Sequence, residues 1–292
     1  MSVGGRPRGT ATGVQVSQQS SVEWTENRAT AGRRALDLAE LWAYRELVLF
    51  LALRDLKVRY RQAVFGVAWA IFQPLAGLAV AIVVFHNLAD IPSDRLPYPV
   101  FAFLGFTVWS YFSSSLDGAT ASLVGNASLV TKIYFPRMVA PIAAVLPRLV
   151  DTAIAFLLLG GLMAWYGVTP GPALLLLPVW FAALVLLAFG AGLVLATLNV
   201  TYRDVANAIG LLTQLWLFAS PVVYPSSLVP GRWRLLYAVN PMVGILDGFR
   251  WSVLGAPRPP AVDAVSALTL LVLLIGGVRY FQRCERRFAD VI

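Results

Sequence analysis

The sequence predicts an all-α polytopic membrane protein. We expect six transmembrane helices, an N-terminal amphipathic helix at the membrane interface and short re-entrant helices at the outer face. Three observations lead to this fold class. Hydrophobic residues make up 58% of the 292-residue chain and charged residues only 13%, a composition typical of polytopic membrane proteins. Six apolar runs are long enough to cross a bilayer, and a dense basic segment directly precedes the first of them.

The first 34 residues predict a disordered cytoplasmic tail, and residues 35–292 are expected to form the transmembrane domain. The tail is rich in Ser, Gly, Thr and Gln and lacks apolar periodicity, so it has little surface with which to build a core. No apolar core follows its early arginines at the usual distance, which argues against a signal peptide.

A basic amphipathic helix is predicted just before the first span. Residues Leu49–Leu75 begin with the four cations Arg54, Lys57, Arg59 and Arg61. The first, second and fourth of these are spaced i, i+3, i+7 and share one helical face, while another face carries Leu53, Leu56 and Tyr60. A basic amphipathic helix that leads into a span is typical of a segment on the cytoplasmic membrane surface.

Six spans follow from the requirement for about 20 apolar residues each. Their approximate ranges are Gly66–His86, Pro99–Leu116, Ile142–Trp165, Ala173–Leu198, Ala206–Tyr224 and Val262–Tyr280. Small residues within them, such as Gly190 and Gly192, favour close helix contacts.

The bias of Lys and Arg predicts that both termini lie in the cytoplasm. With this orientation, the inner side receives most of the cations: Arg54, Lys57, Arg59, Arg61, Lys132, Arg137, Arg203, Arg279, Arg283, Arg286 and Arg287. The net charge of +8 gathers at the ends of apolar runs, so lipid headgroups explain it better than nucleic acid does.

Two connections between spans have a predicted structure. In Gly118–Pro141, a short helix from Asn126 to Tyr134 would form a cytoplasmic knob for a soluble partner; a structureless loop is the alternative.

The segment Pro225–Pro260 is too polar for a full span and predicts short amphipathic or re-entrant helices at the outer face. Within it, Asp247 and Arg250 are spaced i, i+3 and could form an ion pair. The alternative is that this pair is an ordinary surface pair of little energetic value.

Few residues are available for catalysis or energy coupling. The chain has no G-x-x-x-x-G-K-[ST] motif, so it carries no P-loop for ATP. His86 and Cys284 are the only residues of their kinds, which excludes histidine- or thiolate-based metal sites and catalytic triads. The main intramembrane ions are Arg148 and Asp151, spaced to pair. They either snorkel near the cytoplasmic boundary or take part in gating and substrate contact.

Aromatic residues are concentrated in the first, second and fifth spans. Membrane-interface belts are the general explanation. The alternative is that some rings line a conduit, where flat faces with polar tips suit the surfaces of sugars. The candidates for channel lining are Trp69, Phe72, Phe103, Phe106, Trp109, Trp216 and Tyr224.

From about Leu41 to the C-terminus, the chain resembles the ABC-2 type permeases that export O-antigen, capsule, teichoic acid and cell-wall galactan. The resemblance rests on several ordered motifs: LALRDLKVRYRQAVFGVAWAIFQPL, NASLVTKIYFPRMVAPI, LNVTYRDV, SPVVYP and VNPMVGILDGFR. It implies a homodimer in the bacterial plasma membrane, paired with two copies of a cytoplasmic P-loop ATPase that bind ATP and Mg. It also implies a polyprenyl-diphosphate-linked polysaccharide that passes outward between the two permeases.

The same resemblance assigns roles to three segments. Arg54–Gln62 matches the cytoplasmic interface helix and Asn126–Tyr134, with Ser128, Leu129 and Lys132, matches the coupling helix. Pro225–Arg250, with Asn240 and Pro241, matches the outer gate helices. The basic cluster is then divided among ATPase, lipid headgroups and the diphosphate of the carrier.

Two rival functions remain. A gradient-driven secondary transporter would depend on Asp151, but the spans lack a chain of acids. A membrane-bound glycan transferase would need catalytic acids, and the outer segment offers only Asp247 and Asp263.

Overall fold

In a computed structural model of the chain, the residues described are 38–61, 68–94, 96–132, 135–285 and 288. Every regular element within these ranges is helical, which confirms the all-α class. The predicted tail, residues 1–34, lies outside the described residues.

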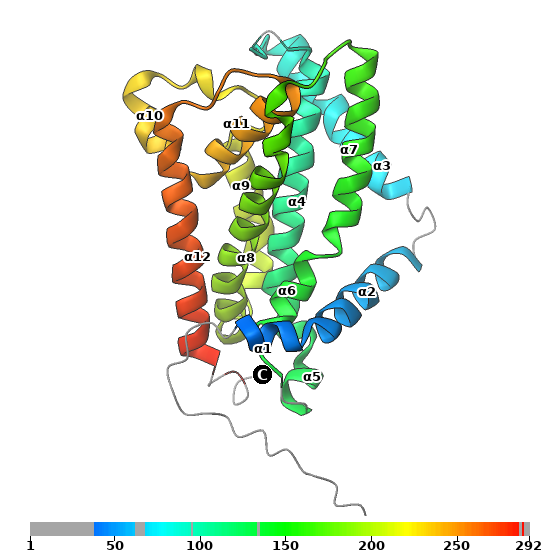
Figure 1. The fold of residues 1–292 in the computed structure, drawn as a ribbon, viewed down its shortest axis with the longest axis vertical. Coiled ribbons are helices and arrows are strands. Elements are labelled where there is room, and N and C mark those ends of the chain that lie inside the picture. Colours follow the sequence, from blue (N-terminus) through cyan, green and yellow to red (C-terminus); the bar gives the residue numbers. More distant parts are fainter. Residues whose placement is uncertain (1–37, 62–67, 95, 133–134, 286–287, 289–292) are drawn as a thin grey trace, which may run out of the picture. The chain divides into compact units, whose positions relative to one another are not determined.

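Twelve α-helices follow one another in the described ranges (Figure 1). They are α1 (Leu38–Ala43), α2 (Arg45–Arg61), α3 (Ala68–Ala81), α4 (Tyr98–Gly125), α5 (Ala127–Lys132), α6 (Val139–Val145), α7 (Arg148–Trp165), α8 (Leu177–Thr201), α9 (Val205–Phe218), α10 (Gly231–Ala238), α11 (Pro241–Leu254) and α12 (Ala264–Cys284). Short π- or 3₁₀-helices lie at Ile82–Leu88, Pro172–Leu176, Ser226–Leu228 and Ala261–Asp263.

Three helical stretches are both long and apolar enough to cross a membrane: Val139–Trp165, Pro172–Thr201 and Ala261–Cys284. They correspond to the third, fourth and sixth predicted spans. The first and fifth correspond to the shorter apolar helices Pro74–Leu88 and Val205–Phe218. Fourteen residues of α-helix rise only about 21 Å, less than the roughly 30 Å of a hydrocarbon core. The count of six spans therefore stays a prediction.

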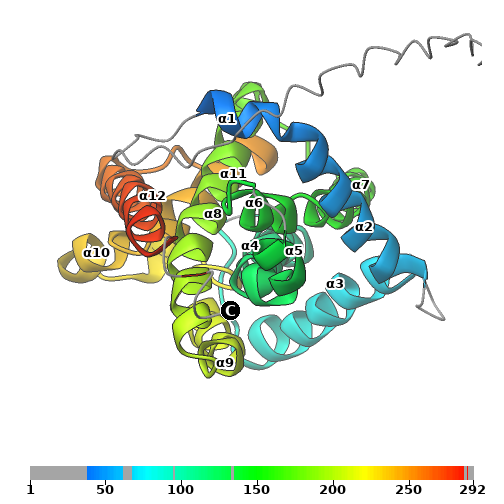
Figure 2. The ribbon, with the colours of Figure 1, turned by 90° about the horizontal axis from the view of Figure 1, so that it is seen from below.

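The second predicted span is part of a longer helix, α4, which has 28 residues and lies at the centre of the bundle. Helices α3, α6, α7, α8, α9 and α11 all contact it, and Figure 2 shows them arranged around it. Large side chains such as Phe101, Tyr111 and Phe112 on α4 are almost completely buried. The core of the bundle is therefore built on this one helix.

The two ends of the bundle differ in what they carry. The α5 end has α1, α2, α5 and the last residues of α12, whereas α10 lies at the opposite end, called the α10 end below (Figure 1). The α5 end thus contains the cations of α2, α5 and the end of α12, which the sequence predicts to be cytoplasmic. The exposed Arg232 of α10 lies at the other end.

Glycines allow the closest helix contacts, as the sequence predicts. A Cβ at Gly277 of α12 would lie 2.3 Å from the carbonyl oxygen of Gly190 on α8, and a Cβ at Gly192 of α8 would lie 2.6 Å from the Cβ of Ala119 on α4. Without side chains at these positions the backbones approach directly, which increases van der Waals contact between helices in a bilayer.

We predict that Gly277→Ala destabilises the packing of α8 on α12. The added methyl group cannot fit against the carbonyl of Gly190, and overpacking of this kind typically costs about 1–3 kcal/mol. The thermal unfolding midpoint of the detergent-purified protein should fall. Gly276→Ala is the matched control, because a Cβ there meets nothing within 4 Å. Equal midpoints for the two variants would contradict the close approach.

Candidate functional site

The basic surface helix and the predicted knob meet through a hydrogen bond between side chains. Nη2 of Arg54 on α2 donates a hydrogen bond of 2.8 Å to Oδ1 of Asn126, the residue that ends α4 and precedes α5. The same guanidinium donates to Asp55 at 2.8 and 2.9 Å. Asn126 is buried, and its Nδ2 donates to the carbonyl oxygen of Ser122 at 2.8 Å. Two segments 72 residues apart in sequence are thereby held together at the α5 end.

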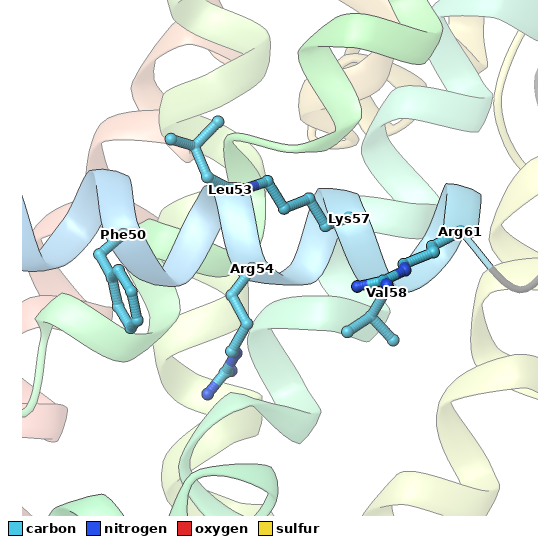
Figure 3. Close-up of a pocket in the computed structure, with 6 residues that line it drawn as sticks. All are labelled: Phe50, Leu53, Arg54, Lys57, Val58 and Arg61. Atoms are coloured by element: carbon cyan, nitrogen blue, oxygen red, sulfur yellow. The ribbon is translucent and has the colours of Figure 1, made fainter.

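The outward face of α2 carries a groove of about 560 Å³ in which cations alternate with apolar side chains. Figure 3 shows the six lining residues along a single helix: Phe50, Leu53, Arg54, Lys57, Val58 and Arg61. The shared face of Arg54, Lys57 and Arg61 is confirmed. The assignment of Leu53 to a separate apolar face is wrong, because it is 53% exposed and lines the same groove.

The reason lies in where the helix begins. Helix α2 starts at Arg45, nine residues before the interface segment predicted from Arg54 to Gln62, of which Gln62 lies outside the described residues. Its inward side is formed largely by the earlier part, where Val48, Leu51 and Ala52 are buried. Leu53 falls on the opposite side of the helix from Leu51 because adjacent positions are separated by about 100°.

The predicted knob is a helix, α5, and not a structureless loop. The carbonyl oxygen of Asn126 accepts hydrogen bonds from the backbone N–H groups of Leu129 and Val130 at 2.9 and 3.0 Å. Ser128 and Lys132 are exposed, whereas Leu129 is half-buried. Tyr134 lies outside the described residues. We use the name docking face for the groove residues of α2 together with α5.

The predicted pair of Arg148 and Asp151 is wrong. The partners of Asp151 among the described residues come from α2: Nη1 of Arg59 lies 2.9 Å from Oδ2 of Asp151, and the hydroxyl of Tyr60 donates to Oδ1. Burial, followed by the hydrogen bond to Asp151, raises the pKa of Tyr60 to about 12, so Tyr60 keeps its donor proton at neutral pH. Asp151 therefore fastens the last turn of α2 to α7.

Arg148 points elsewhere. Its Nη2 lies 3.9 Å from the position at which a side chain would start on Gly118 of α4, and its Nε is buried without a hydrogen-bond partner. The residue begins α7 and is half-buried. Arg148 thus reaches from α7 toward Gly118 of α4.

A further contact joins the end of α12 to the segment before α6. The backbone N–H of Arg137 donates to Oε1 of Glu285 at 3.2 Å, and the Arg137 guanidinium donates to the Glu285 carbonyl oxygen. Burial raises the pKa of Glu285, although the hydrogen bond from the backbone N–H of Arg137 and the charge of Arg137 act in the opposite direction. The sequence gives no signal for this contact, because its partners are 148 residues apart.

At the α10 end, Asn240 joins the end of α9 to the start of α11. Its Oδ1 accepts from Nε1 of Trp216 at 2.9 Å and from the N–H of Met242 at 3.1 Å. Its Nδ2 donates to the carbonyl oxygen of Ala219 at 3.1 Å and to the hydroxyl of Ser220 at 2.9 Å. Pro241 occupies the first position of α11, where its missing N–H costs no hydrogen bond.

Asp247 and Arg250 on α11 pair with an Oδ1–Nη1 distance of 3.7 Å, but they do not form an ordinary surface pair. Arg250 is 3% exposed, and its guanidinium lies 3.7 Å from the ring centroid of Phe101 on α4. Its Nη2 donates to the carbonyl oxygen of Val222 at 3.0 Å, and the hydroxyl of Ser226 donates to Asp247. The contact of the Arg250 guanidinium with the Phe101 ring therefore joins α11 to α4.

Two of the aromatic candidates lie inside a single copy of the chain. Phe103 and Trp109 of α4 are buried in the bundle core, which favours a packing role. Phe106 is half-buried, and its ring would lie 3.9 Å from a Cβ placed on Gly77 of α3. Phe72 of α3 is 61% exposed, and the side chain of Trp69 lies outside the part that the structure describes.

The other two aromatic candidates are at the α10 end. Trp216 packs edge-on against Phe112, with ring centroids 5.0 Å apart, and helps to line a groove of about 540 Å³ with Trp233 and Tyr237. The hydroxyl of Tyr224 donates to the carbonyl oxygen of Phe218 and accepts from Tyr237 at 3.0 Å. A channel role for any of these rings stays a prediction.

The chain is similar to proteins of one family over most of its length. A family model described as "ABC-2 type transporter" matches residues 46–254. The O-antigen export system permease protein RfbA of Myxococcus xanthus is 32% identical over 261 residues, which cover 87% of this chain and 98% of the relative. A protein of the same name from Klebsiella pneumoniae is 27% identical, with 85% and 95% covered. The polysialic acid transport protein KpsM of Escherichia coli is 24% identical, with 80% and 92% covered.

We predict that Asp151→Asn loosens the last turn of α2. The half-exposed ion pair with Arg59 contributes about 1 kcal/mol or less, and the hydrogen bond from Tyr60 to a charged acceptor about 1.5–3 kcal/mol. Hydrogen exchange of the backbone amides of Arg59–Arg61 should accelerate, and Tyr60→Phe should accelerate it in part. Asp204→Asn, in an exposed turn, is the control. Unchanged exchange of these amides in Asp151→Asn would contradict the contact between Asp151 and the last turn of α2.

Proposed function

The chain belongs to the ABC-2 type transporter family, and from this membership we propose that it is the permease subunit of an ATP-driven polysaccharide exporter. The transported molecule would be a polysaccharide linked to a polyprenyl diphosphate. Similarity to O-antigen and polysialic acid transport proteins over 80% or more of the chain supports the substrate class. The subunit would act as a homodimer in the bacterial inner membrane.

The observation that carries the proposal is the contact of Arg54 with Asn126. It joins the surface helix α2 and the short exposed helix α5, which are far apart in the sequence, into the docking face. Because the chain has no P-loop, the energy must come from another subunit. We propose that two copies of a cytoplasmic ATPase bind ATP and Mg and press on this face, one copy for each permease.

Charge supports the orientation. The docking face and the end of α12 bring the exposed cations Lys57, Arg61, Lys132, Arg279 and Arg283 to the α5 end. Cytoplasmic loops carry an excess of Lys and Arg near span ends. The α5 end is therefore assigned to the cytoplasm, and the α10 end, with Asn240, Pro241, Asp247 and Arg250, to the outer side as a gate.

The contacts of the docking face would carry the motion of the ATPase into the membrane spans. A push on α5 reaches α4 through Asn126, which ends that helix. A push on α2 reaches α7 through Arg59 and Asp151. Because helices are stiff, both displacements pass into the spans, where they separate the two permeases. Lys57 and Arg61 would be free to bind acidic side chains of the ATPase, lipid headgroups or the diphosphate of the carrier.

The alternative of a gradient-driven transporter has less support. It depends on Asp151 as a titrating acid, and that carboxylate is held by Arg59 and Tyr60. These contacts give the carboxylate a structural role between α7 and α2, and the spans lack the chain of acids that such a carrier would use.

The test is co-purification in mild detergent, followed by an export assay in cells. We expect the chain to bring down a P-loop ATPase. The double charge reversal Lys57→Glu with Arg61→Glu should abolish both co-purification and export while insertion stays intact, because it reverses the charge of the outward α2 groove. The matched control is Arg232→Glu, an exposed cation on α10, which should leave ATPase binding unchanged.

Two results would contradict the proposal. One is glycan export by the chain without any ATPase, which would favour a gradient-driven carrier. The other is unchanged ATPase binding and export in the doubly reversed variant.

A further inference from the structure

The last helix, α12, is fastened at each end to a different part of the bundle. Glu285 directly follows it at the α5 end, and Ser266 lies in its first turn. These residues are 19 positions apart, about 28 Å along a helix, which is close to the roughly 30 Å of a hydrocarbon core. Figure 1 shows α12 running from the level of α10 to the α5 end. The helix therefore spans the distance between the two ends of the bundle.

The contact at the α5 end is reciprocal, because each side chain binds the backbone of the other residue. Oε1 of Glu285 accepts from the backbone N–H of Arg137 at 3.2 Å, and the Arg137 guanidinium donates to the carbonyl oxygen of Glu285. This guanidinium also lies 5.9 Å from the ring centroid of Phe288. The Phe288 ring packs edge-on against Phe281 of α12, with centroids 5.2 Å apart, and both rings are buried. The end of α12 is thus held to Arg137 by hydrogen bonds and by ring packing.

Arg137 lies on the connection between α5, which ends at Lys132, and α6, which begins at Val139. Its neighbours Phe135 and Met138 are buried in the same apolar cluster as Phe281 of α12. A displacement of α5 would therefore be passed along the chain to Arg137, and from Arg137 to the end of α12.

At the α10 end, Ser266 joins α12 to the junction of α10 and α11. Its hydroxyl donates to the carbonyl oxygens of Ala238, which ends α10, and of Asn240, which precedes α11, at 2.8 and 3.2 Å. The same oxygen accepts from the N–H of Gly244 on α11 at 3.3 Å. Ser266 is only 2% exposed, so water does not replace these bonds. The start of α12 is thus fixed to both helices of the α10 end.

Helix α8 supports α12 between these two contacts. A Cβ at Gly190 of α8 would lie 2.7 Å from the Cα of Leu274, and a Cβ at Gly277 would lie 2.3 Å from the carbonyl oxygen of Gly190. Helix α12 contains no proline, which is a common cause of kinks. Because close-packed helices deform little, a displacement at one end of α12 reaches the other end instead of being absorbed by bending.

We propose that α12 carries the ATPase-driven displacement of α5 to the outer gate, with Arg137, Glu285 and Ser266 as positioning residues. We call this helix with its three contacts the α12 link. The proposal rests on the proposed function and adds to it the element that joins the docking face to the gate. A push on α5 moves Arg137 and the end of α12, and Ser266 then shifts the junction of α10 and α11.

Hydrogen exchange at the far end of the α12 link tests the proposal. The full chain, with the ATPase that it brings down, is measured with and without ATP and Mg. Opening of the gate should accelerate exchange of the α10 amides. In Glu285→Ala, which removes the acceptor for the Arg137 N–H, this ATP response and export in cells should fall at least about fivefold, the lower end of typical coupling between sites. Glu285→Gln keeps an acceptor oxygen and should retain most of the response.

Ser266→Ala interrupts the α12 link at its other end, far from the docking face. ATPase co-purification should stay at the parent level in Ser266→Ala and in Glu285→Ala, while both lose the ATP response. Because both changes act on one link, export by the double variant should be no lower than by the weaker single variant, whereas independent defects would multiply. Asp204→Ala, which removes an exposed acid in the turn after α8, is the matched control and should leave the response unchanged.

Three results would overturn the proposal. An unchanged ATP response in Glu285→Ala or Ser266→Ala would favour transmission along α4 alone. Loss of ATPase co-purification in Glu285→Ala would mean that its contact only supports the docking face. Export losses that multiply in the double variant would show two separate structural defects. A parent chain that brings down no ATPase would contradict the proposed function instead, so the two failures are distinguishable.

Discussion

The fold depends on the burial of α4 by six neighbouring helices. At one end, Asn126 ends this helix and accepts from Arg54 of the docking face. Toward the other end, a Cβ at Gly105 would lie 2.2 Å from the carbonyl oxygen of Val222, and Phe101 lies against the Arg250 guanidinium. One long helix therefore connects the α5 end and the α10 end of the bundle. In the proposed function, a displacement of α5 would be transmitted along α4 because close-packed interiors deform little.

A second constraint is the satisfaction of backbone polar groups at membrane depth. Helix α9 ends at Phe218, and the segment that follows is not helical. Asn240 accepts or donates four hydrogen bonds there, including one to the carbonyl oxygen of Ala219. Irregular backbone in a bilayer is tolerated where protein or a water-filled cavity surrounds it. The hydrogen bonds of Asn240 to the segment after the short α9 follow this rule.

Much of this architecture could be predicted from local patterns. Apolar runs gave the helices, the i, i+3, i+7 spacing gave the outward cations of α2, and the short helix α5 was predicted from Asn126. Partners distant in sequence could not be predicted. The spacing of Arg148 and Asp151 suggested a local pair, but Tyr60, 91 residues away from Asp151, binds that carboxylate instead. The burial of Arg250 likewise depends on Phe101 and Val222. Helical periodicity cannot predict these contacts, because both partners lie far from Arg250 in the sequence.

The central claim is that α2 and α5 form one face that binds an ATPase. Photo-crosslinking from single sites tests it most directly, with a photoreactive amino acid at Ser128 on α5 or at Trp233 on α10, both exposed. The account predicts that position 128 crosslinks to a polypeptide containing a P-loop sequence and that position 233 does not. The account would be contradicted if position 128 captured no such polypeptide, or if both positions captured it equally.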